Sequence, residues 1–129
     1  MKRLRTLPRP TEGELELLGI LWDRGPSTVR DVHDQISRRR PLGYTSVLKL
    51  LQIMTDKGLV EREESGKAHI YRPVASQNET QDQILRDMSA RLFSGSAAQL
   101  AMHALSLEPV NEQELEELRH LIDQKRQRP

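Results

Sequence analysis

Glycine and proline residues divide residues 11–58 into three short segments, each with the spacing of an amphipathic helix. Gly25 and the proline after it end the first segment, Pro41 and Gly43 interrupt the chain before the third, and Gly58 closes the third. Leu, Ile and Val side chains recur at helical intervals within the segments. Three helices of this length with such short connections predict a helix-turn-helix core.

Residues that favour helix N-termini occur where these helices should begin. Thr11 and Glu14 have the spacing of a capping box, in which each side chain accepts a hydrogen bond from the other residue's backbone N–H. Ser27 or Thr28 is expected to cap the second helix. The third helix is expected over residues 45–57.

Two strand-like segments follow the third helix. Residues 59–63 and 68–72 alternate apolar and polar side chains, and residues 64–67 between them include Gly66, which suits a tight turn. A hairpin in this place forms the wing of a winged helix. The predicted fold class is mainly α with a small β-hairpin wing, in which residues 1–75 form a winged helix-turn-helix domain.

Beyond Pro73 the pattern is helical, after a polar hinge at residues 76–80. Three helical segments there carry apolar stripes that so short a stretch of chain cannot cover by itself. We therefore expect residues 76–129 to form a helical dimerization domain in which two copies of the chain interleave. The side chains expected in the homodimer interface are Ile84, Leu85, Met88, Leu92, Phe93, Leu100, Leu105, Leu115, Leu118 and Ile122.

Charge is distributed unevenly along the chain. Residues 1–75 contain 14 Lys and Arg against 10 Asp and Glu, whereas residues 76–129 contain 6 against 9. A basic first half favours a polyanionic partner such as nucleic acid. Lys2, Arg3, Arg5 and Arg9 could form an arm over a DNA backbone, but a frayed tail is the expectation for the first few of them.

Several classes of function find no support in the composition. The chain contains no cysteine, so disulfides and thiolate metal sites are excluded. Its four histidines lie far apart without metal-ligand spacing, and no nucleophile or phosphate-loop motif occurs, so we expect neither an enzyme nor a cofactor nor a bound metal. The basic start lacks the apolar stretch of a signal peptide, and no membrane span occurs, so we expect a cytoplasmic protein without direct membrane association.

The third predicted helix has two different faces. At about 100° per residue, one arc carries Val47, Leu50, Leu51 and Met54, and the opposite arc carries Thr45, Lys49, Gln52 and Asp56. Thr, Lys and Gln suit the edges of DNA bases, and the second helix of a helix-turn-helix inserts its N-terminal part into the major groove. The residues expected to read bases are Tyr44, Thr45, Ser46, Leu48, Lys49 and Gln52, with Leu48 against a thymine methyl.

Basic residues on either side of this helix are candidates for phosphate contacts. Arg38, Arg39 and Arg40 precede it, and Lys67 lies at the predicted tip of the wing. A winged-helix module that binds another protein is the alternative, for which the aliphatic Leu48 and Ile53 on the third helix would be suitable.

Several short motifs follow one another along the chain. They are Thr11-Glu12-Gly13-Glu14-Leu15-Glu16, Leu21-Trp22, Gly25-Pro26-Ser27-Thr28-Val29-Arg30-Asp31-Val32, Gly43-Tyr44-Thr45-Ser46-Val47-Leu48, Lys57-Gly58-Leu59-Val60, Tyr71-Arg72-Pro73, Leu92-Phe93-Ser94-Gly95-Ser96 and Leu115-Glu116-Glu117-Leu118. In this order and spacing they closely resemble the penicillinase-repressor family of bacterial transcription regulators (BlaI/MecI/CopY). The resemblance covers nearly the whole chain. It implies a homodimeric, sequence-specific repressor that acts on inverted-repeat operators.

Branches of this family differ in their inducing signal. Relatives that control β-lactam resistance are inactivated by proteolysis under a membrane sensor-protease, and the matching segment here surrounds His103 and Ala104, which differ from the cleaved pair of those relatives. The copper-responsive branch uses a Cys-x-Cys pair, which this chain lacks. Ile53 occupies a position at which many relatives have arginine, and we expect its side chain to pack on a neighbouring helix.

Overall fold

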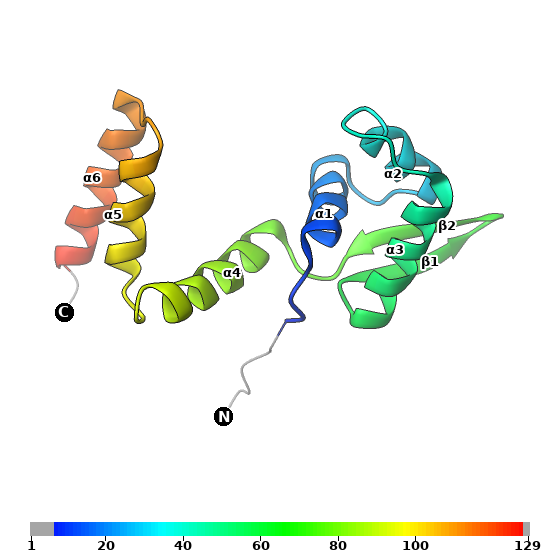
Figure 1. Cartoon of the computed structure of the whole chain (residues 1–129), viewed down its shortest axis with the longest axis horizontal. Coiled ribbons are helices and arrows are strands. Elements are labelled where there is room, and N and C mark those ends of the chain that lie inside the picture. The colour runs from blue at the N-terminus through cyan, green and yellow to red at the C-terminus, as the bar shows by residue number, and fades with distance from the viewer. Residues whose placement is uncertain (1–6, 128–129) are drawn as a thin grey trace. The chain divides into compact units, whose positions relative to one another are not determined.

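The computed structural model describes residues 7–127 of the 129-residue chain (Figure 1). Its elements are α1 (Glu12–Arg24), α2 (Val29–Ile36), α3 (Tyr44–Lys57), β1 (Val60–Ser65), β2 (Ala68–Pro73), α4 (Gln77–Leu92), α5 (Ala97–Leu107) and α6 (Glu112–Gln127). Six helices and one hairpin in the described part of the chain confirm a mainly α fold. The basic residues Lys2, Arg3 and Arg5 lie outside the described residues.

The chain divides into two compact units, Met1–Leu85 and Arg86–Pro129. The division falls within α4, whose residues belong partly to each unit. The predicted division into a winged-helix domain, residues 1–75, and a dimerization domain, residues 76–129, stays a prediction.

Reciprocal caps start the first two helices. Glu14 N–H donates to Thr11 Oγ1 at 3.2 Å, and Thr11 N–H donates to Glu14 Oε1 at 2.8 Å, so the predicted capping box is confirmed. Of the two candidates for α2, Thr28 forms the cap, with both hydrogen bonds to Asp31 at 3.1 Å. The backbone N–H of Thr28 lowers the pKa of the Asp31 carboxyl, and Arg24 at 3.2 Å adds to this effect.

The first unit encloses one apolar core between its helices and its hairpin. The buried apolar side chains are Leu17, Leu18, Ile20, Leu21, Val29, Val32, Ile36, Val47, Leu51, Met54, Leu59, Val60 and Tyr71. Leu50, predicted on the inward arc of α3, is half-buried at the edge of this core. The third helix stops at Gly58, whose left-handed backbone (φ 83°) lets the chain turn directly into β1.

A buried tyrosine of the hairpin packs in the core and also pairs with the segment before α2. Strands β1 and β2 pair antiparallel from Val60 opposite Pro73 to Ser65 opposite Ala68, and the tip of the hairpin projects away from the helices (Figure 1). Tyr71 also exchanges both backbone hydrogen bonds with Ser27, at 3.0 and 2.8 Å. The segment before α2 is thus joined to β2 by an isolated β-bridge, which helps to fix the base of the wing.

The second unit leaves most of its apolar side chains uncovered. Neither α5 nor α6 contains a buried residue. An open groove of about 440 Å³ lies between them, lined by Leu105, Leu115, Leu118, Arg119, Ile122, Asp123 and Arg126. No helix in residues 7–127 has both the length and the apolar character needed to cross a membrane.

Candidate nucleic-acid interface

The two faces predicted for α3 are present in the structure. Val47, Leu51 and Met54 are completely buried, whereas Thr45, Ser46, Lys49 and Gln52 are exposed. The core therefore fixes the orientation of α3, and a row of hydrogen-bonding side chains remains available to a partner. Whether these residues read bases stays a prediction.

Tyr44 begins α3 and is held by a residue that sequence reasoning missed. The Tyr44 ring is 48% exposed and meets the edge or face of the His33 ring at 5.8 Å between centroids and 74° between planes. His33 Nε2 lies 2.9 Å from Leu42 O and 3.2 Å from Ser37 Oγ. His33 thus connects α2 to the connector before α3, a contact that its sequence position did not predict.

The three predicted phosphate-binding arginines differ in their surroundings. All three are exposed in the turn after α2, but Arg40 forms an ion pair with Glu16 of α1 at 2.9 Å. Within residues 7–127, the side chains of Arg38 and Arg39 form no hydrogen bond or ion pair. Lys67 is exposed in the β1–β2 turn, next to Gly66 with φ 64°. Contacts of Arg38, Arg39 and Lys67 with phosphates stay a prediction.

Two aliphatic residues on the flanks of α3, Leu48 and Ile53, differ in how far they are exposed. Leu48 is half-buried and packs against the core, and its predicted contact with a thymine methyl stays a prediction. Ile53 is 41% exposed and does not belong to the apolar cluster. The expectation that Ile53 packs on a neighbouring helix is therefore wrong within the described residues. The error arose because Ile53 lies on a flank of α3, where periodicity alone decides burial poorly.

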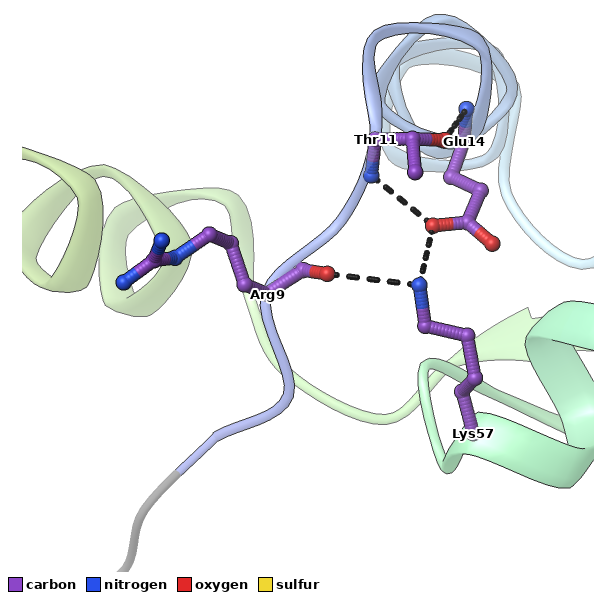
Figure 2. A network of polar contacts seen from close by, with 4 residues as sticks. All are labelled: Arg9, Thr11, Glu14 and Lys57. Atoms are coloured by element: carbon purple, nitrogen blue, oxygen red, sulfur yellow. Dashed lines mark hydrogen bonds and ion pairs between the residues drawn. The ribbon is translucent and has the colours of Figure 1, made fainter.

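An ion pair between a partly exposed lysine and a buried glutamate joins the C-terminal end of α3 to the start of α1. Figure 2 shows Lys57 Nζ between Glu14 Oε1, at 2.6 Å, and the backbone oxygen of Arg9, at 3.3 Å. The Glu14 side chain is 3% exposed and that of Lys57 34%. Burial raises the pKa of the Glu14 carboxyl, but hydrogen bonds from Lys57 and Thr11 together with the Lys57 charge outweigh it, so the pKa is lowered. The pair therefore ties the end of α3 to the start of α1, which helps to fix the orientation of α3.

The residues predicted for dimerization are largely exposed in the single chain. Leu85, Met88, Leu92, Leu105, Leu115 and Ile122 are between 39% and 71% exposed, while Ile84, Phe93, Leu100 and Leu118 are half-buried. The Phe93 ring meets the His103 ring at 5.8 Å in an edge-to-face contact. His103 and Ala104, the predicted proteolysis region, lie exposed on α5.

No group of three or more residues that could hold a metal ion occurs among residues 7–127. The described side chains therefore offer a polar helix face, flanking cations and apolar helix stripes, all of which suit binding. None of these features supplies a converging set of nucleophile, acid and base.

Three helices and a hairpin in this order define a winged helix-turn-helix protein, here followed by helices with unpartnered apolar faces. Residues 10–124 match the penicillinase repressor family, and the chain belongs to that family. It is a transcription regulator and not an enzyme.

Two relatives illustrate this membership. The chain is 37% identical over 93 residues to the transcriptional regulator BlaI of Mycobacterium tuberculosis, covering 70% of this chain and 67% of that protein. It is 18% identical over 115 residues to the methicillin resistance regulatory protein MecI of Mammaliicoccus sciuri, covering 89% and 94% of the two chains.

A solved structure supports the fold. Bacillus licheniformis BlaI, determined in solution as a monomeric form in complex with the blaP half-operator, aligns with a TM-score of 0.52 at 17% identity. The alignment covers 59% of this chain and 93% of that chain. The winged-helix prediction is thereby confirmed.

Proposed function

We propose that this chain is a sequence-specific, DNA-binding transcriptional repressor that acts as a homodimer on inverted-repeat operators. The observation that carries the proposal is the orientation of α3, whose buried face is fixed by the core while Thr45, Lys49 and Gln52 point outward. Lys donates to guanine O6 and N7, and Gln pairs with adenine N6 and N7 in the major groove. Membership in the penicillinase repressor family supports the same function.

The flanking cations would position the protein on the duplex without reading sequence. Arg38 and Arg39 precede α3, and Lys67 projects from the wing, so phosphates on both sides of a groove occupied by α3 are within the reach of basic side chains. α3 also begins at Gly43 without a side-chain cap, which leaves its first N–H groups available to a phosphate. Bacillus licheniformis BlaI was solved on a half-operator, which supports DNA as the partner here.

A second copy of the chain is the proposed cover for the apolar helices of the second unit. Leu92 is 71% and Ile122 53% exposed, and no residue of α5 or α6 is buried. Exposed apolar surface of this extent is characteristic of an interface. A twofold dimer would present two copies of α3 to two half-sites, as operator symmetry requires.

Salt dependence tests the contact with DNA. A dimer that neutralises six phosphates, three for each copy, should bind duplex DNA with a log–log salt slope of about −5.4. Replacing Arg39 with alanine removes two of these contacts and should bring the slope to about −3.6, with affinity lowered alike for all sequences. Lys125→Ala, which removes an exposed cation from α6, is the matched control and should keep the slope. Binding that does not respond to salt would exclude this interface.

Release of the repressor by proteolysis is a finer part of the proposal. His103 and Ala104 are exposed but helical, and a protease needs an extended strand, so cleavage there would require local unfolding of α5. In this proposal, a membrane sensor-protease system supplies the signal that starts cleavage of the chain in the cytoplasm.

A module that binds only another protein is the second candidate, supported by the exposed Ile53 on α3. The salt slope separates the two candidates, because a purely protein-binding module has no counterions to release from DNA.

A further inference from the structure

Ile53 is an exposed aliphatic side chain on the part of α3 that the proposed function directs at DNA. It is 41% exposed, whereas Leu48 and Leu50, the other flanking aliphatic residues of α3, pack against the core. Val47, Leu51 and Met54 of the same helix are completely buried, so its exposure sets Ile53 apart from the apolar residues that form the core. The fold of residues 7–127 therefore gives this side chain no role in the core.

Position along the helix places Ile53 in one row with two polar residues. Ser46, Lys49 and Ile53 are spaced i, i+3 and i+7, which brings them within an arc of about 60° on the helix surface. Homeodomains read the major groove from helix positions that include the same spacing. The row is about 10 Å long, on the order of three base-pair steps, so a groove that receives Ser46 and Lys49 also receives Ile53.

The chemistry of an isoleucine restricts what it can recognise in a major groove. It neither donates nor accepts a hydrogen bond, and burying it against a base amide or carbonyl would leave that polar group without a partner. The apolar group that base pairs present there is the C5-methyl of thymine, to which 5-methylcytosine adds an identical methyl on a different pyrimidine. A methyl contact is favourable for both sides because it removes apolar surface from water.

We propose that Ile53 is a specificity-determining residue that contacts the C5-methyl group of one pyrimidine in each half-site, about two base-pair steps from the base read by Lys49. The inference rests on the proposed function, since it assigns a ligand to a residue within the same DNA-binding face. A DNA occupant is favoured over a protein because the surface around Ile53 is continuous with Lys49 and Gln52, both exposed and polar.

The test uses the full chain and the duplex that it enriches from a randomised pool. Each thymine of that duplex is replaced in turn by deoxyuridine, which removes only the C5-methyl. For the wild type, one thymine in each half-site should respond, with about a fourfold loss of affinity for each methyl removed. For Ile53→Ala the starting affinity should be lower by a similar factor, and deoxyuridine at that position should cause no further loss.

Two further comparisons show whether the methyl group is what the protein recognises and which residue contacts it. Cytosine at the responding position should bind weakly and 5-methylcytosine should recover part of the affinity, if the methyl rather than the thymine carbonyl is recognised. Leu48→Ala removes the other aliphatic side chain expected to contact a thymine methyl, and it should keep the response at the position where Ile53→Ala abolishes it. The fold of each variant is checked by the fluorescence of Trp22, the single tryptophan.

The outcomes separate this inference from the proposed function. If no duplex is enriched, the DNA-binding proposal itself fails. If a duplex is enriched but deoxyuridine affects the wild type and Ile53→Ala equally at every position, the assignment of Ile53 is overturned while the repressor proposal stands. A deoxyuridine response abolished by Leu48→Ala instead would overturn it in favour of Leu48.

Discussion

Replacing Ile122 with lysine should convert the protein from a dimer to a monomer and lower its affinity for inverted-repeat DNA by about 10²–10⁴-fold. Ile122 lines the open groove between α5 and α6 and is 53% exposed in the single chain, so a charge there does not disturb the chain's own packing. In the proposed interface the same charge would be buried without a partner. A monomer engages one half-site and loses the high effective concentration of the second.

Sedimentation at micromolar concentration and operator titration measure the two effects. Gln124→Lys introduces the same charge on the opposite face of α6 and should leave both the dimer and its affinity intact. A wild-type chain that sediments as a monomer, or an Ile122→Lys chain that remains dimeric, would contradict the assignment of this surface.

Replacing Lys57 with alanine should destabilise the winged-helix unit by about 2–3 kcal/mol at neutral pH. The variant removes the ammonium group that lies 2.6 Å from Glu14 Oε1. The Glu14 carboxylate, 3% exposed, then keeps the hydrogen bond from the backbone N–H of Thr11 but has no opposite charge beside it. The cost lies below that of a fully buried pair, because Lys57 itself is one third exposed. Urea unfolding followed by Trp22 fluorescence, at one protein concentration, reports the free energy of unfolding of this unit. Asp56→Ala, an exposed neighbour, should change it by less than about 0.5 kcal/mol.

The pH dependence of this loss has a defined sign. The folded state lowers the pKa of Glu14, so the stability that the pair contributes is fully present above the unfolded pKa and disappears as the pH falls through the folded pKa. The difference between the wild type and Lys57→Ala should therefore shrink below about pH 4.3, the ordinary pKa of glutamate. Asp31, whose pKa is also lowered, is present in both chains and cancels in the difference. A difference that stayed constant down to pH 3 would show that Lys57 stabilises by packing alone.

Local signals in the sequence were sufficient for much of the fold. Thr11 with Glu14 predicted the first cap, Gly58 predicted the end of α3, and Gly66 predicted the turn of the wing, since each depends on a few neighbouring residues. The inward face of α3 followed from periodicity in the same way, because Val47 and its partners repeat at helical spacing.

Contacts between distant residues could not be predicted from such signals. Lys57 meets Glu14 across 43 residues, and Tyr71 pairs with Ser27 across 44, without any local pattern that marks either pair. His33 looked isolated because Leu42 and Tyr44 reach it only once the connector has folded. Ile53 was misjudged for the related reason that a helix flank is covered or exposed according to its neighbours in space. The sequence therefore predicted which face of α3 points outward, but the contacts that orient this helix were found only in the structure.

Sequencing of the duplexes that the full chain enriches from a randomised pool tests the central claim most directly. The account predicts two inverted half-sites with centres about 10–10.5 base pairs, or a multiple of this spacing, apart. It also predicts that Lys49→Ala relaxes the preference at one position of each half-site, where the wild type discriminates by about 1–3 kcal/mol. Enrichment of a single asymmetric site, or a Lys49→Ala variant that enriches the same sequences as the wild type, would contradict it.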